Sequence, residues 1–101
     1  MDQPAPQAAV AHNEAAHRFE IALPGETAVA EYERRGDQIA FTHTVVPEAY
    51  EGQGLGSRLA RTALDYARDE GLRVAPFCPF FAAYVRRHPE YQPLVVEGFP
   101  L

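Results

Sequence analysis

The spacing of apolar residues changes once along this chain, and that change constrains the fold more than any other feature. Upstream of Pro47, apolar residues alternate with their neighbours over residues 17–23, 27–34 and 38–46. That period of two predicts three strands, and the last of them, apolar or small on both faces, should be central. Downstream of Pro47, apolar residues recur at helical spacing over residues 54–70 and predict an amphipathic helix.

Shorter segments follow the predicted helix. Residues 72–78 read as a buried strand, residues 80–88 as a short helix, and residues 93–96 leave room for a terminal strand. The order β-β-β-α-β-α predicts an α+β fold, with helices packed on a mixed, mostly antiparallel sheet. The strand after the first helix should form one parallel pair through a right-handed crossover.

Composition excludes several classes of function. All nine cationic residues are Arg, so a P-loop lysine and a Schiff-base lysine are both absent. The single Cys cannot form an internal disulfide. A net charge of −5 disfavours a nucleic-acid partner, and no metal is expected.

The same composition bears on location and domain organisation. No apolar run approaches the length of a membrane span, and the N-terminus lacks a signal-peptide pattern, so a cytoplasmic protein is expected. Residues 1–16 have few bulky apolar side chains and predict a disordered tail. Residues 17–101 are then one domain.

The strongest chemical signal is a glycine-rich turn between the third strand and the first helix. Free N–H groups at a helix start, together with the positive end of the helix dipole, form an anion site. Ser57 stands where a dinucleotide-binding fingerprint would need its third glycine. The turn therefore predicts a phosphate site of another kind, built from Gly52, Gln53, Gly54, Gly56 and Ser57.

Five short motifs, taken in order, resemble the GCN5-related N-acetyltransferases, and specifically their small, single-domain YjdJ-like branch. The first two are His43-Thr44-x-Val46-Pro47 and the turn itself, where Glu51-x-x-Gly54-x-Gly56 stands for the family's Gln/Arg-x-x-Gly-x-Gly/Ala. The others are Ala63-Leu64-Asp65-Tyr66-Ala67, Val74-x-Pro76-x-Cys78-Pro79-Phe80 and Tyr84-x-x-Arg87-His88-Pro89-x-Tyr91.

The resemblance implies acetyl-coenzyme A as co-substrate and an amine, either a small molecule or a protein or peptide, as acceptor. It places the coenzyme pyrophosphate at the glycine-rich turn. It also implies that a backbone N–H of Val45 or Val46 polarises the thioester carbonyl. Tyr84 and Arg87 are additional coenzyme-binding candidates, because Arg suits bidentate phosphate contact; solvated surface is the other interpretation of Arg87.

Two side chains are candidates for the chemistry. His43, interpreted as sharing a face with Ile39 and Phe41, can accept a proton from an amine, or it can be a partly buried core residue. Cys78 can accept the acyl group, protonate the leaving thiolate, or only pack beside the pantetheine arm. Its apolar neighbours favour the thiol, so direct transfer in a ternary complex, assisted by Cys78, is the hypothesis. Glu48 is a further candidate base, and a solvated loop carboxylate is its other interpretation.

Two functions follow from these residues. The first is an acetyl-coenzyme A-dependent N-acetyltransferase. The alternative is a catalytically weak or inactive acyl-coenzyme A binding or sensing module, which the carboxylate of Glu51 beside a pyrophosphate favours. A plain protein-interaction domain would leave the glycine-rich turn unexplained. The acceptor's identity and the oligomeric state are open.

Overall fold

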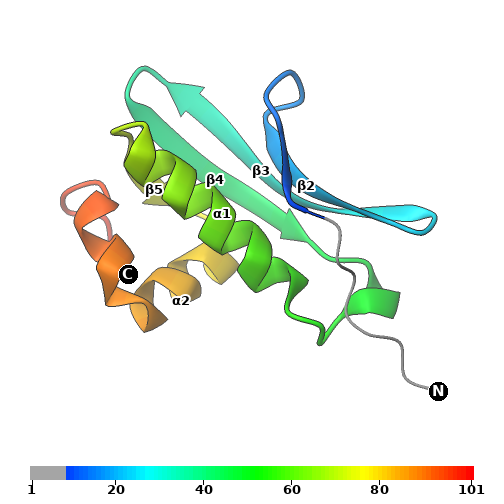
Figure 1. Ribbon diagram of the computed structural model, residues 1–101. Coiled ribbons are helices and arrows are strands. Elements are labelled where there is room, and N and C mark those ends of the chain that lie inside the picture. Colours follow the sequence, from blue (N-terminus) through cyan, green and yellow to red (C-terminus); the bar gives the residue numbers. More distant parts are fainter. Residues whose placement is uncertain (1–8) are drawn as a thin grey trace.

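Five strands lie in one sheet in the order β1-β2-β3-β4-β5 in the computed structural model, which describes residues 9–101 (Figure 1). The strands are β1 (Ala11–Asn13), β2 (Arg18–Leu23), β3 (Glu26–Arg35), β4 (Gln38–Val45) and β5 (Arg73–Pro76). The helices are α1 (Leu55–Asp69) and α2 (Pro79–Arg87), and η1 (Glu48–Tyr50) and η2 (Pro89–Leu94) are 3-10 helices. The predicted α+β fold with a mixed sheet is confirmed.

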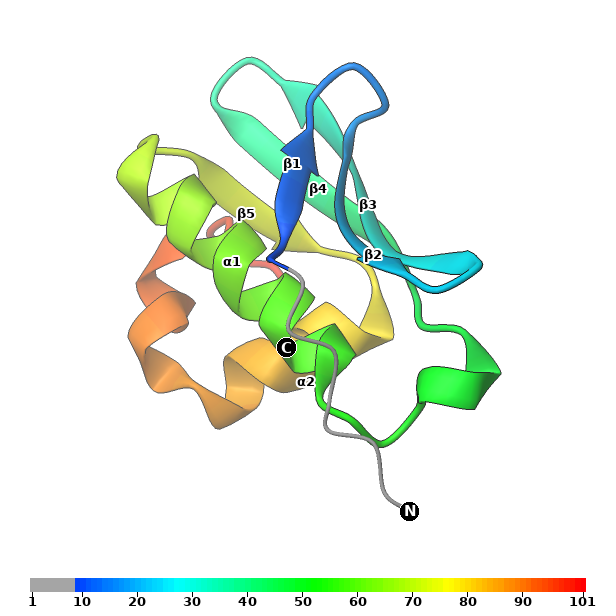
Figure 2. The same cartoon turned by 45° about the vertical axis from the view of Figure 1, so that its right-hand side comes forward.

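The only parallel pair among these strands is β4 with β5 (Figure 2). Helix α1 carries the chain back across the sheet between them, which confirms the predicted crossover connection. The pairing ends where Phe41 meets Pro76, although β4 continues to Val45. The sheet therefore opens beyond Phe41, beside the segment that leads into α1.

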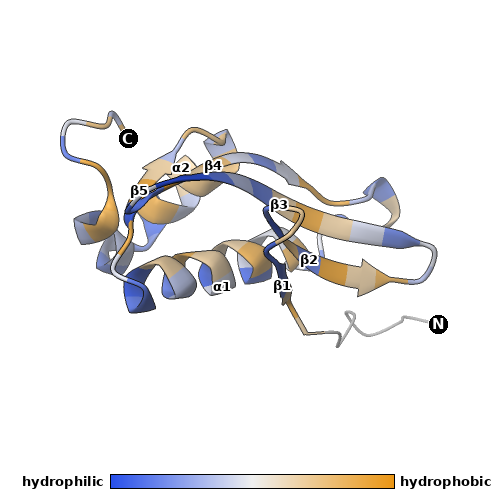
Figure 3. Ribbon diagram, turned by 90° about the horizontal axis from the view of Figure 1, so that it is seen from above, coloured by the Kyte–Doolittle hydropathy of each residue, from blue (hydrophilic) through white to orange (hydrophobic). Residues whose placement is uncertain are grey.

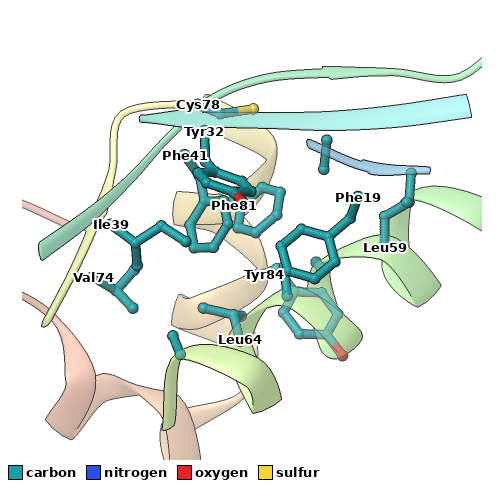
Figure 4. Packing of buried hydrophobic residues seen from close by; sticks show 14 of the residues in the cluster. Phe19, Tyr32, Ile39, Phe41, Leu59, Leu64, Val74, Cys78, Phe81 and Tyr84 are labelled. Atoms are coloured by element: carbon teal, nitrogen blue, oxygen red, sulfur yellow. The ribbon is translucent and has the colours of Figure 1, made fainter. Parts of the chain in front are cut away.

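The core lies between the sheet and the two helices. Helix α1 turns its apolar side toward the sheet and its polar side away (Figure 3). The Phe81 ring of α2 stacks on the Phe41 ring of β4 with 4.2 Å between centroids, and both side chains are fully buried (Figure 4). Tyr32 packs edge-on against Phe41. These contacts place α2 on the same face of the sheet as α1.

The structure differs from the predicted N-terminal tail at β1, whose residues pair with β2. His12 explains the difference, because its ring stacks on Phe19 at 4.1 Å and its Nε2 lies 2.6 Å from the Tyr32 hydroxyl. It also meets Tyr66 of α1 edge-on. One amphipathic residue thus gives the segment enough buried contact to order it. Residues 1–8 of the predicted tail lie outside the described residues.

We expect His12 to make stability depend on pH. Burial lowers the pKa of His12 below its usual 6.5, with smaller opposing effects of Glu14 and Arg34. The unfolded chain therefore takes up this proton first as pH falls through 6.5, and the free energy of unfolding falls until the folded-state pKa is passed. Urea denaturation at about pH 7.5 and about pH 5.5 should show this fall, and His12→Gln should reduce it. Equal pH dependence in both proteins would contradict the assignment.

The C-terminal segment forms less regular structure than predicted. Residues 93–96 are not a strand: η2 occupies residues to Leu94, and a single parallel bridge joins Val95 to Val74. Pro93, which has no N–H to donate, explains the short pairing. The Tyr91 hydroxyl donates to Asp65 of α1 at 2.7 Å and fastens η2 to that helix. Within residues 9–101, no helix has the length and apolar character needed to cross a membrane.

Candidate functional site

A pocket lies where the sheet opens, between the end of β4 and the start of α1. Its volume is about 460 Å³. One wall is the unpaired end of β4, another is the glycine-rich turn, and the Phe80 ring of α2 closes a third side. The lining residues are Thr44, Val45, Val46, Tyr50, Glu51, Gly52, Gly54, Leu55, Gly56, Ser57 and Phe80.

The start of α1 provides three hydrogen-bond donors to this pocket. Gly54 is the N-cap residue in the left-handed conformation (φ 78°), and the first helical hydrogen bond runs from Arg58 N–H to its carbonyl at 3.1 Å. The N–H groups of Leu55, Gly56 and Ser57 precede that bond, and none has a partner within residues 9–101. Three free donors at the positive end of a fifteen-residue helix are the arrangement with which a helix start can bind an anion.

Gly56 is required by packing as well as by the turn. A Cβ atom at this position would lie 2.8 Å from Cζ of Phe80, well inside van der Waals contact. The missing side chain therefore lets the Phe80 ring lie against the first turn of α1. Gly54 is different, because its positive φ is the requirement and the space around it is open. The sequence predicts phosphate binding for both glycines, and the contact of Gly56 with Phe80 has no signature in the local sequence.

A β-bulge in the β3–β4 ladder changes which way the end of β4 points. Tyr32 pairs with Phe41 but Glu31 pairs with His43, so Thr42 is the additional residue. Because side chains alternate with a period of two, the extra residue reverses the alternation beyond it. The His43 side chain is 71% exposed on the outer face, where its Nδ1 lies 3.6 Å from a Glu31 carboxylate oxygen. The prediction that it shares a face with Phe41 is wrong.

The same reversal turns Thr44 toward Cys78. The Cys78 N–H donates to the carbonyl of Phe41 at 2.9 Å, and its Sγ lies 3.3 Å from Thr44 Oγ1. Cys78 is only 5% exposed and is not part of the pocket wall, whereas Thr44 is. The sulfur therefore reaches the pocket through the Thr44 hydroxyl. The two predicted catalytic side chains, His43 and Cys78, lie on opposite sides of β4.

Comparison with known proteins shows to which family the chain belongs. The sequence pattern of the GCN5-related N-acetyltransferases matches residues 18–94. The chain belongs to this family. Its relatives include protein NATD1 of Mus musculus and of Homo sapiens, each 36% identical to this chain over 83 residues. The matched residues are 79% of this chain, 76% of the mouse protein and 74% of the human protein. NATD1 of Danio rerio is 34% identical over 87 residues, 81% of this chain and 79% of its own.

A solved structure shows the same fold. A Staphylococcus aureus protein, described as GCN5-like and determined in solution by NMR, superposes with a TM-score of 0.68. The superposition covers 86% of each chain at 23% sequence identity. The α+β architecture with two helices on a five-stranded sheet is therefore a small version of the GCN5-related fold.

Within this GCN5-related chain, the predicted coenzyme-binding residues lie in four places. Gln53 is outside the pocket wall, and its Oε1 is buried without a hydrogen-bond partner in the described chain. Tyr84 is buried and lines a neighbouring pocket. Arg87 is exposed in the last turn of α2. The remaining six line the main pocket: Val45, Val46, Gly52, Gly54, Gly56 and Ser57. Their part in binding stays a prediction.

Thr44 and Tyr50 both line the pocket, although the sequence predicts no role for either side chain. Thr44 gave no signal, because only the bulge turns it inward. Tyr50 lies in η1, a 3-10 helix with no counterpart among the predicted elements, and its hydroxyl lies 3.5 Å from the carbonyl of Pro24 in the β2–β3 turn. Glu51 follows it and brings the only carboxylate to the main pocket's wall among the residues described. Glu48 is exposed in η1.

Proposed function

We propose that this chain transfers an acetyl group from acetyl-coenzyme A to an amine acceptor, by direct attack of the amine in a ternary complex. The observation that carries the proposal is the alignment of three free N–H donors with the open end of β4 in one pocket. An extended ligand with a phosphate end and a narrow, mostly apolar arm fits that arrangement.

Different residues of the pocket would contact the phosphate end and the apolar arm of such a ligand. The N–H groups of Leu55, Gly56 and Ser57 would hold the pyrophosphate, and the missing side chain at Gly54 leaves it room to approach. Val45 and Val46 would flank the pantetheine arm on the β4 side, opposite Phe80. When bound, the coenzyme supplies an activated acyl group as a thioester.

Side chains on the two sides of β4 would accept and donate the two protons of the reaction. The amine nitrogen forms a bond to the acyl carbon, the carbon–sulfur bond breaks, and one proton must leave nitrogen while sulfur gains one. His43, beside Glu31 on the outer face, would accept the first proton. The hydrogen-bonded pair of Thr44 and Cys78 would give the second to the departing sulfur, and solvent would then restore it.

A second candidate function is an acyl-coenzyme A binding or sensing module with little catalysis. Glu51 favours it, because a carboxylate in the pocket wall opposes a pyrophosphate at short range. The exposure of His43 favours it as well, since water competes for a base in that position.

Binding of acetyl-coenzyme A, measured by calorimetry, is expected to depend on the backbone of residue 57. Proline is tolerated in the first turn of a helix and removes its N–H, so Ser57→Pro should weaken binding about tenfold. Ser57→Ala, the matched control, keeps the N–H and should change affinity by no more than about threefold. Circular dichroism checks that α1 persists in both proteins.

Release of free thiol with a panel of amines then separates the two candidate functions. Turnover supports the acetyltransferase, whereas binding without turnover supports the sensing module. If acetyl-coenzyme A does not bind at high micromolar concentration, both are wrong. Equal affinities for Ser57→Pro and Ser57→Ala would show that the coenzyme does not use the N–H of residue 57.

A further inference from the structure

A second pocket, about 280 Å³ in volume, lies between α1 and α2 and adjoins the first at Ser57. The residues of its walls carry two guanidinium groups, two hydroxyls and an imidazole. They belong to Ser57, Arg58, Arg61, Tyr84 and His88. This concentration of positive charge stands out in a chain whose net charge is −5.

Helix geometry directs these groups toward one another. Ser57 and Arg61 are four residues apart and therefore lie on one face of α1, one turn or about 5.4 Å along its axis. Arg61 makes none of the ion pairs or hydrogen bonds found among residues 9–101. Asp65, the carboxylate one turn further on, is already 3.3 Å from Arg68 and accepts the Tyr91 hydroxyl. The charge of Arg61 is therefore available to an anion.

The imidazole of His88 is held in a fixed orientation at the other wall. Its Nδ1 lies 2.8 Å from the carbonyl of Tyr84 and donates to it, because a carbonyl can only accept. The ring also stacks on that of Tyr84 with 3.9 Å between centroids. Because Nδ1 is occupied, Nε2 is the nitrogen of His88 that can contact a ligand.

We propose that this second pocket binds the 3′-phosphate of coenzyme A, with Arg61 as its main ligand; the inference rests on the proposed function. The anion site at the start of α1 and the Arg61 guanidinium are one helical turn apart. In coenzyme A only a ribose ring separates the pyrophosphate from the 3′-phosphate. A ligand that places its pyrophosphate on the N–H groups of residues 55–57 can therefore place its last phosphate against Arg61.

Dephospho-coenzyme A, which lacks only the 3′-phosphate, provides the test. Calorimetry on the full chain should show coenzyme A binding about tenfold more tightly than dephospho-coenzyme A. Arg61→Gln should remove most of that difference by weakening coenzyme A binding alone. Arg86→Gln is the matched control, because Arg86 is an exposed arginine of α2 outside both pockets. The preference should also shrink as salt is added.

The outcomes separate this inference from the proposed function. Equal affinities for the two ligands in the wild-type chain would overturn the inference and leave the proposed function intact. A preference that persists in Arg61→Gln would also overturn it, because the 3′-phosphate would then bind elsewhere. If neither ligand binds, the proposed function fails and the inference fails with it. Both Arg variants should keep the wild-type urea midpoint, since neither side chain is buried.

Discussion

Phe81→Ala is expected to lower the free energy of unfolding by about 4 kcal/mol. The Phe81 side chain is fully buried, and its ring stacks on that of Phe41 with 4.2 Å between centroids. Truncation removes this contact and leaves a cavity between α2 and β4 that the rigid strand cannot close. Because a domain of this size is stable by only about 5–15 kcal/mol, the loss should be evident in urea denaturation at neutral pH.

Phe77→Ala is the matched control for this prediction. Phe77 lies four residues upstream, its side chain is 63% exposed, and its ring meets Phe99 edge-on at 5.2 Å. Its replacement should cost no more than about 1 kcal/mol. Comparable losses in the two variants would contradict the assignment of the Phe41–Phe81 stack as the contact that fixes α2. Coenzyme binding should also weaken in Phe81→Ala, because α2 carries Phe80 into the pocket wall.

The arrangement of elements could be predicted because each depends on a local period. The helix expected over residues 54–70 is observed as Leu55–Asp69, and the three long strands begin and end within two residues of expectation. β1 could not be found in this way, because it depends on contacts of His12 with Phe19, Tyr32 and Tyr66, which lie on other elements. A strand of three residues has no period to detect.

The candidate site could be predicted only as far as its backbone. The glycine-rich turn was recognised from sequence, because positive φ and a helix start both leave a signature in residue type. The face on which each side chain of β4 lies could not be predicted in this way. The additional residue at Thr42 moves the side chains from His43 onward to the opposite face of the sheet from the one that simple alternation predicts. The contact between Gly56 and Phe80 likewise joins residues of different helices, and no local pattern reports it.

Replacing Cys78 by alanine is expected to lower kcat for acetyl transfer about 100-fold while the affinity for acetyl-coenzyme A changes by no more than about threefold. Cys78 lies behind the pocket wall, so its loss should not disturb binding, yet its contact with Thr44 connects it to the site of proton transfer. Stability should fall by only about 1 kcal/mol, because alanine leaves a small cavity. Steady-state kinetics and calorimetry on the same preparation measure the two effects.

Two further variants distinguish proton transfer from packing and from a covalent step. Cys78→Ser keeps a side chain of similar size beside Thr44, but its hydroxyl is a much weaker acid than a thiol, so it should stay nearly as impaired as Cys78→Ala. Thr44→Val removes the hydroxyl that connects Cys78 to the pocket and should be impaired to the same degree. A packing role would instead let Cys78→Ser, which fills the same space, recover most of kcat. In the wild-type chain, mass spectrometry after incubation with acetyl-coenzyme A alone should find no acetyl group on Cys78. An acetyl group that forms there and passes to an added amine as fast as turnover would overturn direct transfer, because the thiol would then be the first acyl acceptor.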